Sequence, residues 1–174
     1  MVELGRIDII AEVYMLASQL ALPREVHLEA VFHIFGYLKG HHNAQMVFDP
    51  TYPTPDMSMF QEHDWCGFYG DVKEVIPSNA PEPRGNEVDM IIFVDSDHAG
   101  DKLTRRSITG YIVFLNNAPI AWLSKKQATI ESSVFGAEFV AMKIGMETLR
   151  GLRYNMCMIG VPISVPSLKY GNNM

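Results

Sequence analysis

Three side chains in the second half of the chain have types and positions that could hold divalent cations. Asp95 follows the apolar run Met90–Val94, Glu138 lies in a long segment with an apolar stripe, and Asn172 follows the short segment Ser167–Tyr170. If both short segments are neighbouring strands and the striped segment is a helix facing them, the three side chains meet at one end of a sheet. Oxygen ligands of this kind suit Mg²⁺ better than Zn²⁺. The pattern therefore predicts a site for two Mg²⁺ ions, with Mn²⁺ as a substitute, which would serve phosphodiester hydrolysis.

The same acidic residues have a second interpretation that involves no metal. Acidic residues after a strand commonly accept hydrogen bonds from the backbone of a turn, and Asp95, Asp97 and Asp101 all occupy such positions. Glu138 would then form an ion pair with a nearby lysine or arginine. Residue pattern by itself leaves both interpretations open.

The charge of the chain is unevenly distributed. The net charge is −6, which argues against nucleic-acid binding because phosphate-binding proteins usually present a basic surface. The segment 102–130, however, contains five basic residues and no acidic residue. They are Lys102, Arg105, Arg106, Lys125 and Lys126. We predict that Arg105, Arg106, Lys125 and Lys126 contact nucleic-acid phosphates, with a solvated hairpin face as the alternative.

The first half of the chain is predicted to be helical and then irregular. Helices are expected over Ile7–Leu20 and Arg24–Lys39, the second with an apolar stripe of Leu28, Val31, Phe35 and Leu38 and with Gly40 as its C-terminal cap. Two such helices cannot bury their apolar faces alone, so this end is expected to belong to a larger unit. Six of the ten prolines lie between residues 50 and 83, which indicates a connector. Its His-x-x-Cys pair, His63 and Cys66, lacks a second ligand pair, so an aromatic loop is expected there rather than a metal site.

The second half of the chain is predicted to form a mixed sheet covered by a helix. Strands are expected at Met90–Val94, which should be covered on both faces, and at Gly110–Leu115, Ile120–Leu123 and Ser167–Tyr170. Asn116 and Asn117 should form the hairpin turn. Ser132 or Ser133 should cap a helix that ends near Tyr154 and presents Val134, Ala137, Glu138, Ala141 and Ile144 to the sheet. The fold class is α/β, with an antiparallel hairpin, a parallel strand and a packed long helix, preceded by a small helical segment.

Several sequence blocks, in this order, resemble the end of a Ty1/copia-type retrotransposon reverse transcriptase and the ribonuclease H domain that follows it. The blocks are Gly5–Ile10, His27–Val31, Gly36–Gly40, Val94–Asp101, Arg105–Tyr111, Trp122–Gln127 and Ser132–Phe139. The resemblance covers nearly the whole chain. It implies a helical reverse-transcriptase tail at 1–50, a proline-rich connector at 51–87 and a C-terminally truncated ribonuclease H-like domain at 88–174.

The resemblance also implies an activity, which is Mg²⁺-dependent cleavage of the RNA strand of an RNA–DNA hybrid. The first metal-binding acid would be Asp95, the second Glu138, and the third would stand at Asn172, where the family has aspartate. A fourth acid and a closing helix would lie beyond Met174. The neutral Asn172 and the missing acid predict an impaired enzyme. The polymerase carboxylates would lie before residue 1, so we expect no polymerisation by this chain.

The same residues leave a second function open and indicate a cellular setting. The alternative to an impaired nuclease is a non-catalytic nucleic-acid-binding remnant of a mobile element. An integrase is disfavoured because no His/Cys zinc module precedes the acids. A globular composition with 48% hydrophobic residues, no run of about 18 apolar residues and no signal peptide predicts an intracellular, cytoplasmic protein without a membrane partner. In an intact element it would lie in a virus-like particle beside the reverse transcriptase of the same polyprotein.

Overall fold

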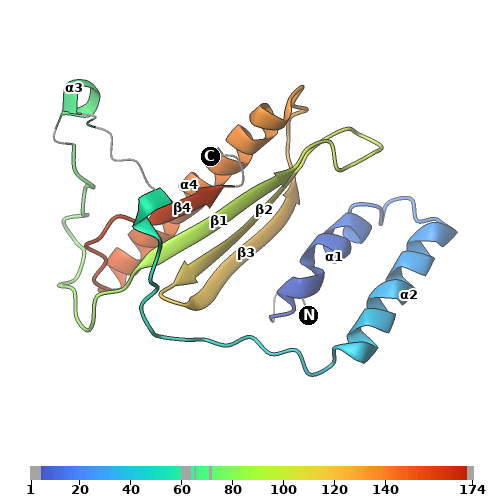
Figure 1. The fold of residues 1–174 in the computed structure, drawn as a ribbon, viewed down its shortest axis with the longest axis horizontal. Coiled ribbons are helices and arrows are strands. Elements are labelled where there is room, and N and C mark those ends of the chain that lie inside the picture. Colours follow the sequence, from blue (N-terminus) through green and yellow to red (C-terminus); the bar gives the residue numbers. More distant parts are fainter. Residues whose placement is uncertain (1–4, 60–63, 65, 71, 172–174) are drawn as a thin grey trace.

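A computed structural model describes residues 5–59, 64, 66–70 and 72–171 of the chain. Short helical segments precede a four-stranded sheet, and one long helix lies between its third and fourth strands in the chain (Figure 1). The elements are η2 (Ile7–Ile9), α1 (Ile10–Ala17), α2 (Glu25–Gly40), η3 (Met57–Met59), α3 (Cys66–Tyr69), β1 (Met90–Asp97), β2 (Ile108–Leu115), β3 (Ala118–Lys126), α4 (Val134–Met158) and β4 (Leu168–Gly171).

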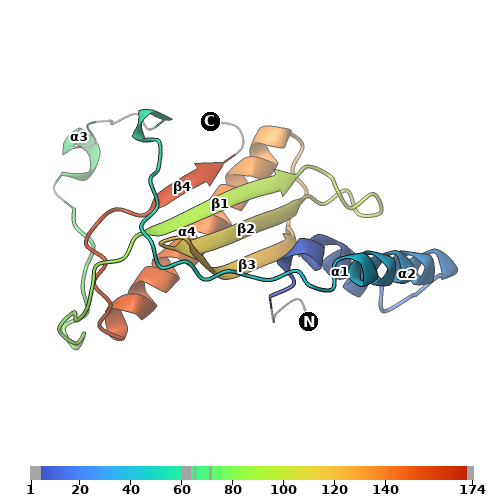
Figure 2. The same cartoon turned by 60° about the horizontal axis from the view of Figure 1, so that its bottom comes forward.

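The sheet has the order β3-β2-β1-β4. β1 pairs antiparallel with β2 and parallel with β4, and β2 and β3 form an antiparallel hairpin. Helix α4 packs mainly against β1 and β2 on one face of the sheet (Figures 1 and 2). The predicted mixed sheet, its hairpin, its parallel strand and its packed helix are therefore confirmed.

The core lies between α4 and the face of β1 that alternation directs toward it. Ile92 and Val94 are buried, and both lie close to Gly145 of α4. Their neighbour Phe93 points to the other face and is 45% exposed. The prediction that both faces of this strand are covered is thus wrong at Phe93, since α4 covers only one face.

The hairpin turn is built on two asparagines, as predicted. Asn116 has a positive φ of 53°, a conformation that asparagine tolerates better than most residues. Its side chain accepts a hydrogen bond from the Asp89 amide (2.9 Å) and donates one to the Pro50 carbonyl (2.9 Å). The turn therefore also anchors the end of the connector to the sheet.

Helix α4 begins at its predicted cap and extends beyond its predicted end. The Ser133 hydroxyl accepts a hydrogen bond from the Gly136 amide (3.0 Å). The helix continues to Met158, past Tyr154, and Gly160 with a φ of 77° follows it. Its buried residues are Ala137, Glu138, Ala141, Gly145 and Leu149. Val134, which was predicted to face the sheet, is 50% exposed because it lies at the helix start, beyond the packed stripe.

Gly145 allows α4 to approach β1 closely, which predicts opposite effects for two glycine substitutions in one helix. A methyl group at Gly145 would lie 2.6 Å from Cγ2 of Val94, whereas one at Gly151 would meet nothing within 4 Å. Gly145→Ala should lower the free energy of unfolding, because overpacking costs about 1–3 kcal/mol. Gly151→Ala should raise it by roughly 0.5–1 kcal/mol through helix propensity. Urea unfolding of both variants measures this, and equal effects at the two positions would contradict the packing.

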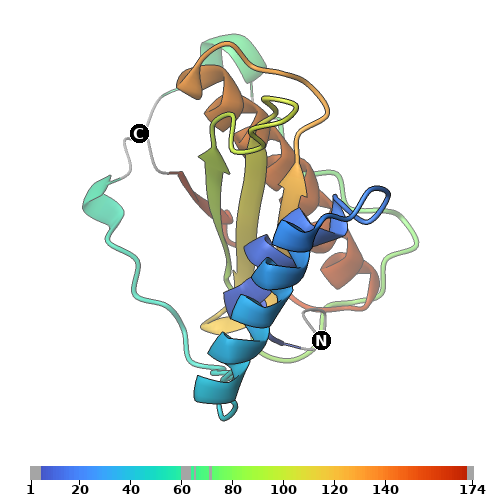
Figure 3. The same cartoon turned by 90° about the vertical axis from the view of Figure 1, so that its right-hand side faces the viewer.

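Helix α1 lies next to β3, and α2 packs beside α1 on the side away from the sheet (Figures 1 and 3). The predicted stripe of α2 is only partly correct. Val31 and Leu38 are half-buried, but Leu28 and Phe35 are 55% and 59% exposed. The stripe is rotated because α1 packs on one side of α2 only. Among the helices of the described residues, none has the length and apolar character needed to cross a membrane.

The connector has little regular structure in its described residues. Asp49 forms an isolated bridge with Asn117, and the Tyr52 hydroxyl donates a hydrogen bond to the Glu87 carbonyl (2.6 Å). His63 of the His-x-x-Cys pair lies outside the described residues, and Cys66 is a free, exposed cysteine at the start of α3. The division of the chain at residues 50 and 87 stays a prediction.

Candidate metal and nucleic-acid site

The candidate metal site lies at the C-terminal end of β1, where the described pairing with β4 ends before Asp95. The parallel pairing with β4 runs from Ile91↔Leu168 to Val94↔Gly171 and ends there. Over the described residues, Asp95 and the two residues after it pair only with β2. Asn172, the predicted third ligand, follows Gly171 and lies outside the described residues.

The Asp95 side chain leaves β1 on the face opposite α4. Its neighbour Val94 packs toward α4, and successive side chains of a strand alternate between faces. Asp95 is exposed, and one carboxylate oxygen accepts a hydrogen bond from the Ser96 amide (2.8 Å). It lines a hollow of about 740 Å³ between η2, the start of α1 and the face of the sheet opposite α4, beside the stacked rings of Phe93 and Tyr170.

The Glu138 side chain lies on the sheet-facing side of α4, as predicted. Glu138 is 7% exposed, and seven residues, or about two helical turns, separate it from Gly145 in the same buried stripe. One turn after Glu138, the Met142 side chain lies 3.6 Å from where a Cβ of Gly171 would stand. Because α4 starts at the C-terminal end of β1, Glu138 lies one turn beyond Met142 toward that end. This places it near the level where the described part of β4 stops.

Among the described residues, Glu138 does not form the ion pair with a lysine or arginine that the second interpretation predicts. The only α4 carboxylate in an ion pair with described residues is Glu147, whose partner is Lys143 (3.9 Å). A buried carboxylate without a cation nearby is unfavourable, so a cationic partner at the C-terminal end of β1 would stabilise Glu138.

Asp95 and Glu138 thus approach the end of β1 from opposite faces of the sheet. Up to Val94, the strands β2 and β4 on either side of β1 separate these two faces of the sheet. Within the described part of the chain, no three His, Cys, Asp or Glu side chains are grouped closely enough to hold a metal ion. The shared cation site stays a prediction.

Asp101, in contrast, accepts hydrogen bonds within a turn, as the second interpretation predicts. It is 3% exposed, its carboxylate forms an ion pair with Lys126, and it accepts hydrogen bonds from the Leu103 amide and the Thr104 hydroxyl. The hydrogen bond from Lys126, followed by that from Thr104, holds the pKa of Asp101 far below its usual range. Asp101 therefore organises the loop between β1 and β2.

The basic residues are divided by this ion pair. Lys102, Arg105, Arg106 and Lys125 are exposed around the β1–β2 loop and the end of β3. The Lys126 side chain is only 16% exposed and is bound to Asp101. Lys126 is thus a structural partner of the loop in this structure, and the exposed residues are the better candidates for phosphate contacts.

A layer of buried polar side chains beside Glu138 was not identified from the sequence as functional. Gln127, Thr109 and Ser107 are all at most 2% exposed and lie between the sheet and the start of α4. Gln127 donates hydrogen bonds to the Thr109 hydroxyl (3.0 Å) and to the Ala137 carbonyl (2.9 Å). The signal available in the sequence was the polar Lys-Lys-Gln ending of an otherwise apolar strand.

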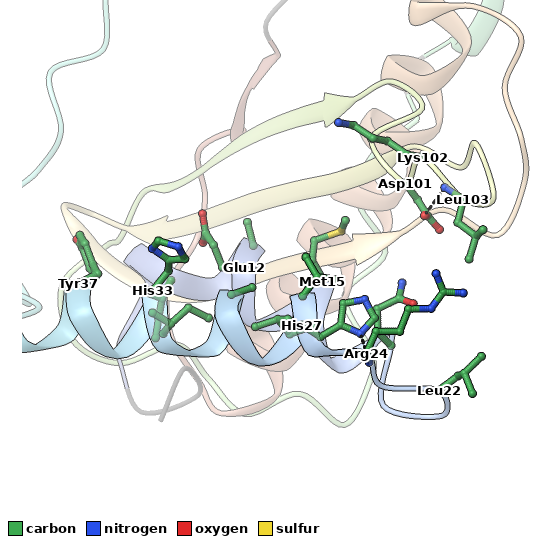
Figure 4. Close-up of a pocket in the computed structure, with 18 of the residues that line it drawn as sticks. Glu12, Met15, Leu22, Arg24, His27, His33, Tyr37, Asp101, Lys102 and Leu103 are labelled. Carbon is green, nitrogen blue, oxygen red and sulfur yellow. Dashed lines mark hydrogen bonds between the residues drawn. The ribbon is translucent and has the colours of Figure 1, made fainter.

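A hollow of about 930 Å³ near the basic loop lies between α1, α2 and residues 100–103 (Figure 4). Its lining includes Met15, Arg24, His33, Tyr37 and Leu103. Neither Asp95 nor Glu138 contributes to it. We therefore place the candidate chemistry at the end of β1 and not in this hollow.

Comparison with known proteins gives relatives along almost the entire chain. The chain is 27% identical over 169 residues to the retrovirus-related Pol polyprotein from transposon RE1 of Arabidopsis thaliana, and 25% identical over 169 residues to that from transposon RE2 of the same plant. Each alignment covers 97% of this chain and 9% of the relative, so the chain spans a small part of these polyproteins. The predicted resemblance to retrotransposon polyproteins is confirmed.

A shorter similarity is found to a secreted RxLR effector protein of Plasmopara viticola, which is 37% identical over 59 residues, or 34% of this chain and 42% of that protein. No protein-family model matches the chain. No solved structure matches it either.

Proposed function

We propose that this chain, whose similarity to transposon Pol polyproteins extends over 97% of its length, contains a ribonuclease H-type domain at residues 88–174. The substrate would be an RNA–DNA hybrid, of which the RNA strand is hydrolysed. Residues 1–50 would be the helical end of the reverse transcriptase of the same copia-type polyprotein. The chain would be located in the compartment where that polyprotein is assembled.

The observation that carries this proposal is the arrangement of β1, β4 and α4. β4 runs parallel to β1 and ends level with Val94, immediately before Asp95. Glu138 faces the sheet from α4 one turn beyond the residue that packs on the last position of β4. The proposal requires a strand-end carboxylate, a helix carboxylate and the residue after Gly171 to meet at the C-terminal end of β1. A two-metal nuclease requires such a convergence of oxygen ligands.

The residues present fit Mg²⁺ in type but supply little negative charge. Asp95 and Glu138 would be carboxylate ligands, and Asn172 would contribute one neutral amide oxygen. When bound, the ions supply an activated water and stabilise the leaving oxygen in phosphodiester hydrolysis. Asp95 is exposed and can approach the substrate, whereas Glu138 is held by the helix and keeps its position. Because only two carboxylates would bind the two ions, we expect weak metal binding and an impaired enzyme.

The hybrid would be held by exposed basic side chains at the same end of the sheet. Arg105 and Arg106 project from the β1–β2 loop, and Lys125 lies on β3 at the position opposite Thr109. Phosphate binding by arginine and lysine is independent of base sequence and depends on salt. Selection of RNA over DNA would come from contacts with 2′-hydroxyl groups.

Charge reversal tests the proposed binding surface. Arg106→Glu together with Lys125→Glu should weaken binding of an RNA–DNA hybrid and reduce the slope of log affinity against log salt by about 2, since each lost phosphate contact removes about 1. The matched control is Lys39→Glu with Lys73→Glu, two exposed lysines outside the β1–β2 loop and β3. Fluorescence anisotropy at several salt concentrations gives both slopes. An unchanged affinity and slope in the first pair would show that these residues are only a solvated face.

A further inference from the structure

Gln127 lies at the junction between the sheet and the first turns of α4. Its side chain is 2% exposed. The backbone amide donates a hydrogen bond to the Ser107 carbonyl (2.8 Å), which continues the pairing of β3 with β2 by one step. The side-chain amide nitrogen donates two hydrogen bonds, to Thr109 Oγ1 (3.0 Å) and to the Ala137 carbonyl (2.9 Å). Gln127 therefore links β2 to α4 through the buried layer.

The hydrogen bond to Ala137 acts directly on the backbone of Glu138. The Ala137 carbonyl belongs to the peptide group that joins Ala137 to Glu138, and a peptide group is planar. Holding this oxygen restrains the orientation of that plane, and with it the point from which the Glu138 side chain departs. The first turns of a helix are otherwise prone to fraying, so a side-chain restraint there changes how well the position is defined.

The hydrogen bond to Thr109 connects the same amide to β2, the strand that pairs with the end of β1. Thr109 pairs with Ser96 across the sheet, and Asp95 pairs with Gly110. Gln127 thus joins α4, which carries Glu138, to β2, the strand that pairs with Asp95. One edge of the bridge is a helix peptide adjacent to Glu138, and the other is the β2 segment that supports the end of β1.

The hydrogen bonding of Gln127 is incomplete in a way that stability alone does not explain. Within the described residues, Gln127 Oε1 and Ser96 Oγ are buried and lack a hydrogen-bond partner. A buried amide with an unpaired oxygen is less favourable than an apolar side chain of similar shape. A methionine would fill this space without the unpaired oxygen. The amide therefore needs a role that an apolar residue cannot fulfil.

We propose that Gln127 is a positioning residue that fixes the Glu138 carboxylate near the C-terminal end of β1, where the divalent cation would bind. This inference rests on the proposed metal site. Residues that orient metal ligands through hydrogen bonds typically change metal affinity by about 10–100-fold when they are removed. Gln127 would act in this way through the Ala137–Glu138 peptide.

The test is Mn²⁺ affinity, measured from the electron paramagnetic resonance signal of free Mn²⁺ during titration of the full chain. Gln127→Met should weaken Mn²⁺ binding by at least about 10-fold. Glu138→Gln should also weaken it, and adding Gln127→Met to Glu138→Gln should have no further effect, because the two residues act through one ligand. Ser107→Ala is the matched control. It removes another buried hydrogen bond at this end of the sheet, from the Ala99 amide to the Ser107 hydroxyl (3.1 Å), and should leave Mn²⁺ affinity within about 2-fold of the parent.

Each outcome of this experiment decides one question. If Glu138→Gln weakens Mn²⁺ binding but Gln127→Met does not, the positioning role is wrong and the metal site stands. If the parent does not bind Mn²⁺, or Glu138→Gln leaves its affinity unchanged, the metal site fails and the positioning role fails with it. Should Gln127→Met not fold, Thr109→Ala removes one of the two acceptors and should weaken Mn²⁺ binding, whereas Thr109→Ser should retain it. Equal affinities of these two variants would overturn the inference.

Discussion

RNA–DNA hybrid cleavage in Mg²⁺ should be slow for the chain as it stands, and at least about 100-fold faster when Asn172→Asp is combined with the downstream segment that carries the fourth acid of the resembled family. The reason is charge. Two divalent cations bring four positive charges, whereas Asp95 and Glu138 bring two negative ones. Substrate phosphate compensates part of this difference. Positioning both ions requires more carboxylate than the two residues supply.

The single changes should be weaker than the combined change. Asn172→Asp alone should tighten Mg²⁺ binding more clearly than it raises turnover, because the site would still lack one carboxylate. The two restorations act on one site, so their effects should not be additive. Rates of hybrid cleavage for the chain, for Asn172→Asp and for the extended chain measure this. Asp95→Asn in the restored, extended chain is the control and should abolish the gain. Efficient cleavage by the unmodified chain would contradict this account.

Lys126→Met should destabilise the fold far more than Lys125→Met. Removing Lys126 leaves the buried Asp101 carboxylate without its cation. The expected loss is about 3 kcal/mol, at the lower end for a broken buried ion pair because Lys126 keeps some contact with solvent. Lys125 is exposed and adjacent in sequence, so Lys125→Met should change stability by less than about 0.5 kcal/mol. Urea unfolding at neutral pH compares the two, and similar losses would argue against a structural ion pair.

The same ion pair should make the free energy of unfolding depend on pH in the acidic range. The pKa of Asp101 is lowered in the folded chain by Lys126 and Thr104. A lowered pKa contributes stability above the ordinary aspartate pKa of about 4, and this contribution is lost as the pH falls below it. The parent should therefore lose stability between about pH 4 and pH 2 more steeply than Lys126→Met. Parallel acid dependences would show that other carboxylates dominate in this range.

The elements of the second half of the chain could be predicted because their signals are local. The apolar run before Asp95, the Asn116 turn and the Ser133 cap each depend on residues close in sequence. Their order along the chain then restricts the sheet to an antiparallel hairpin with an added parallel strand. In the described residues this parallel strand pairs with β1 up to Val94↔Gly171.

Contacts between residues that are distant in the sequence could not be predicted in the same way. Alternation along β1 shows that Val94 and Asp95 point to opposite faces, but only the packing of α4 shows which face is covered. The ion pair between Asp101 and Lys126 joins a loop to a strand end well separated in sequence, and both residues have the surface character of a phosphate site. Gln127 is similar. Its partners at Thr109 and Ala137 become neighbours only after β3 and α4 have packed.

The order of pairing in this sheet has a consequence for folding during synthesis. β1, β2 and β3 follow one another in the chain and pair through short connections, so their antiparallel sheet can form soon after β3 leaves the ribosome. β4 can pair with β1 only after the whole of α4 has been synthesised, because α4 precedes β4 in the chain. This pairing closes a long stretch of chain that includes α4. Until that moment β1 is an edge strand with unpaired backbone groups, the usual template for association between chains. We expect amides of β1 on this side to be the last in the sheet to gain protection from hydrogen exchange on the growing chain.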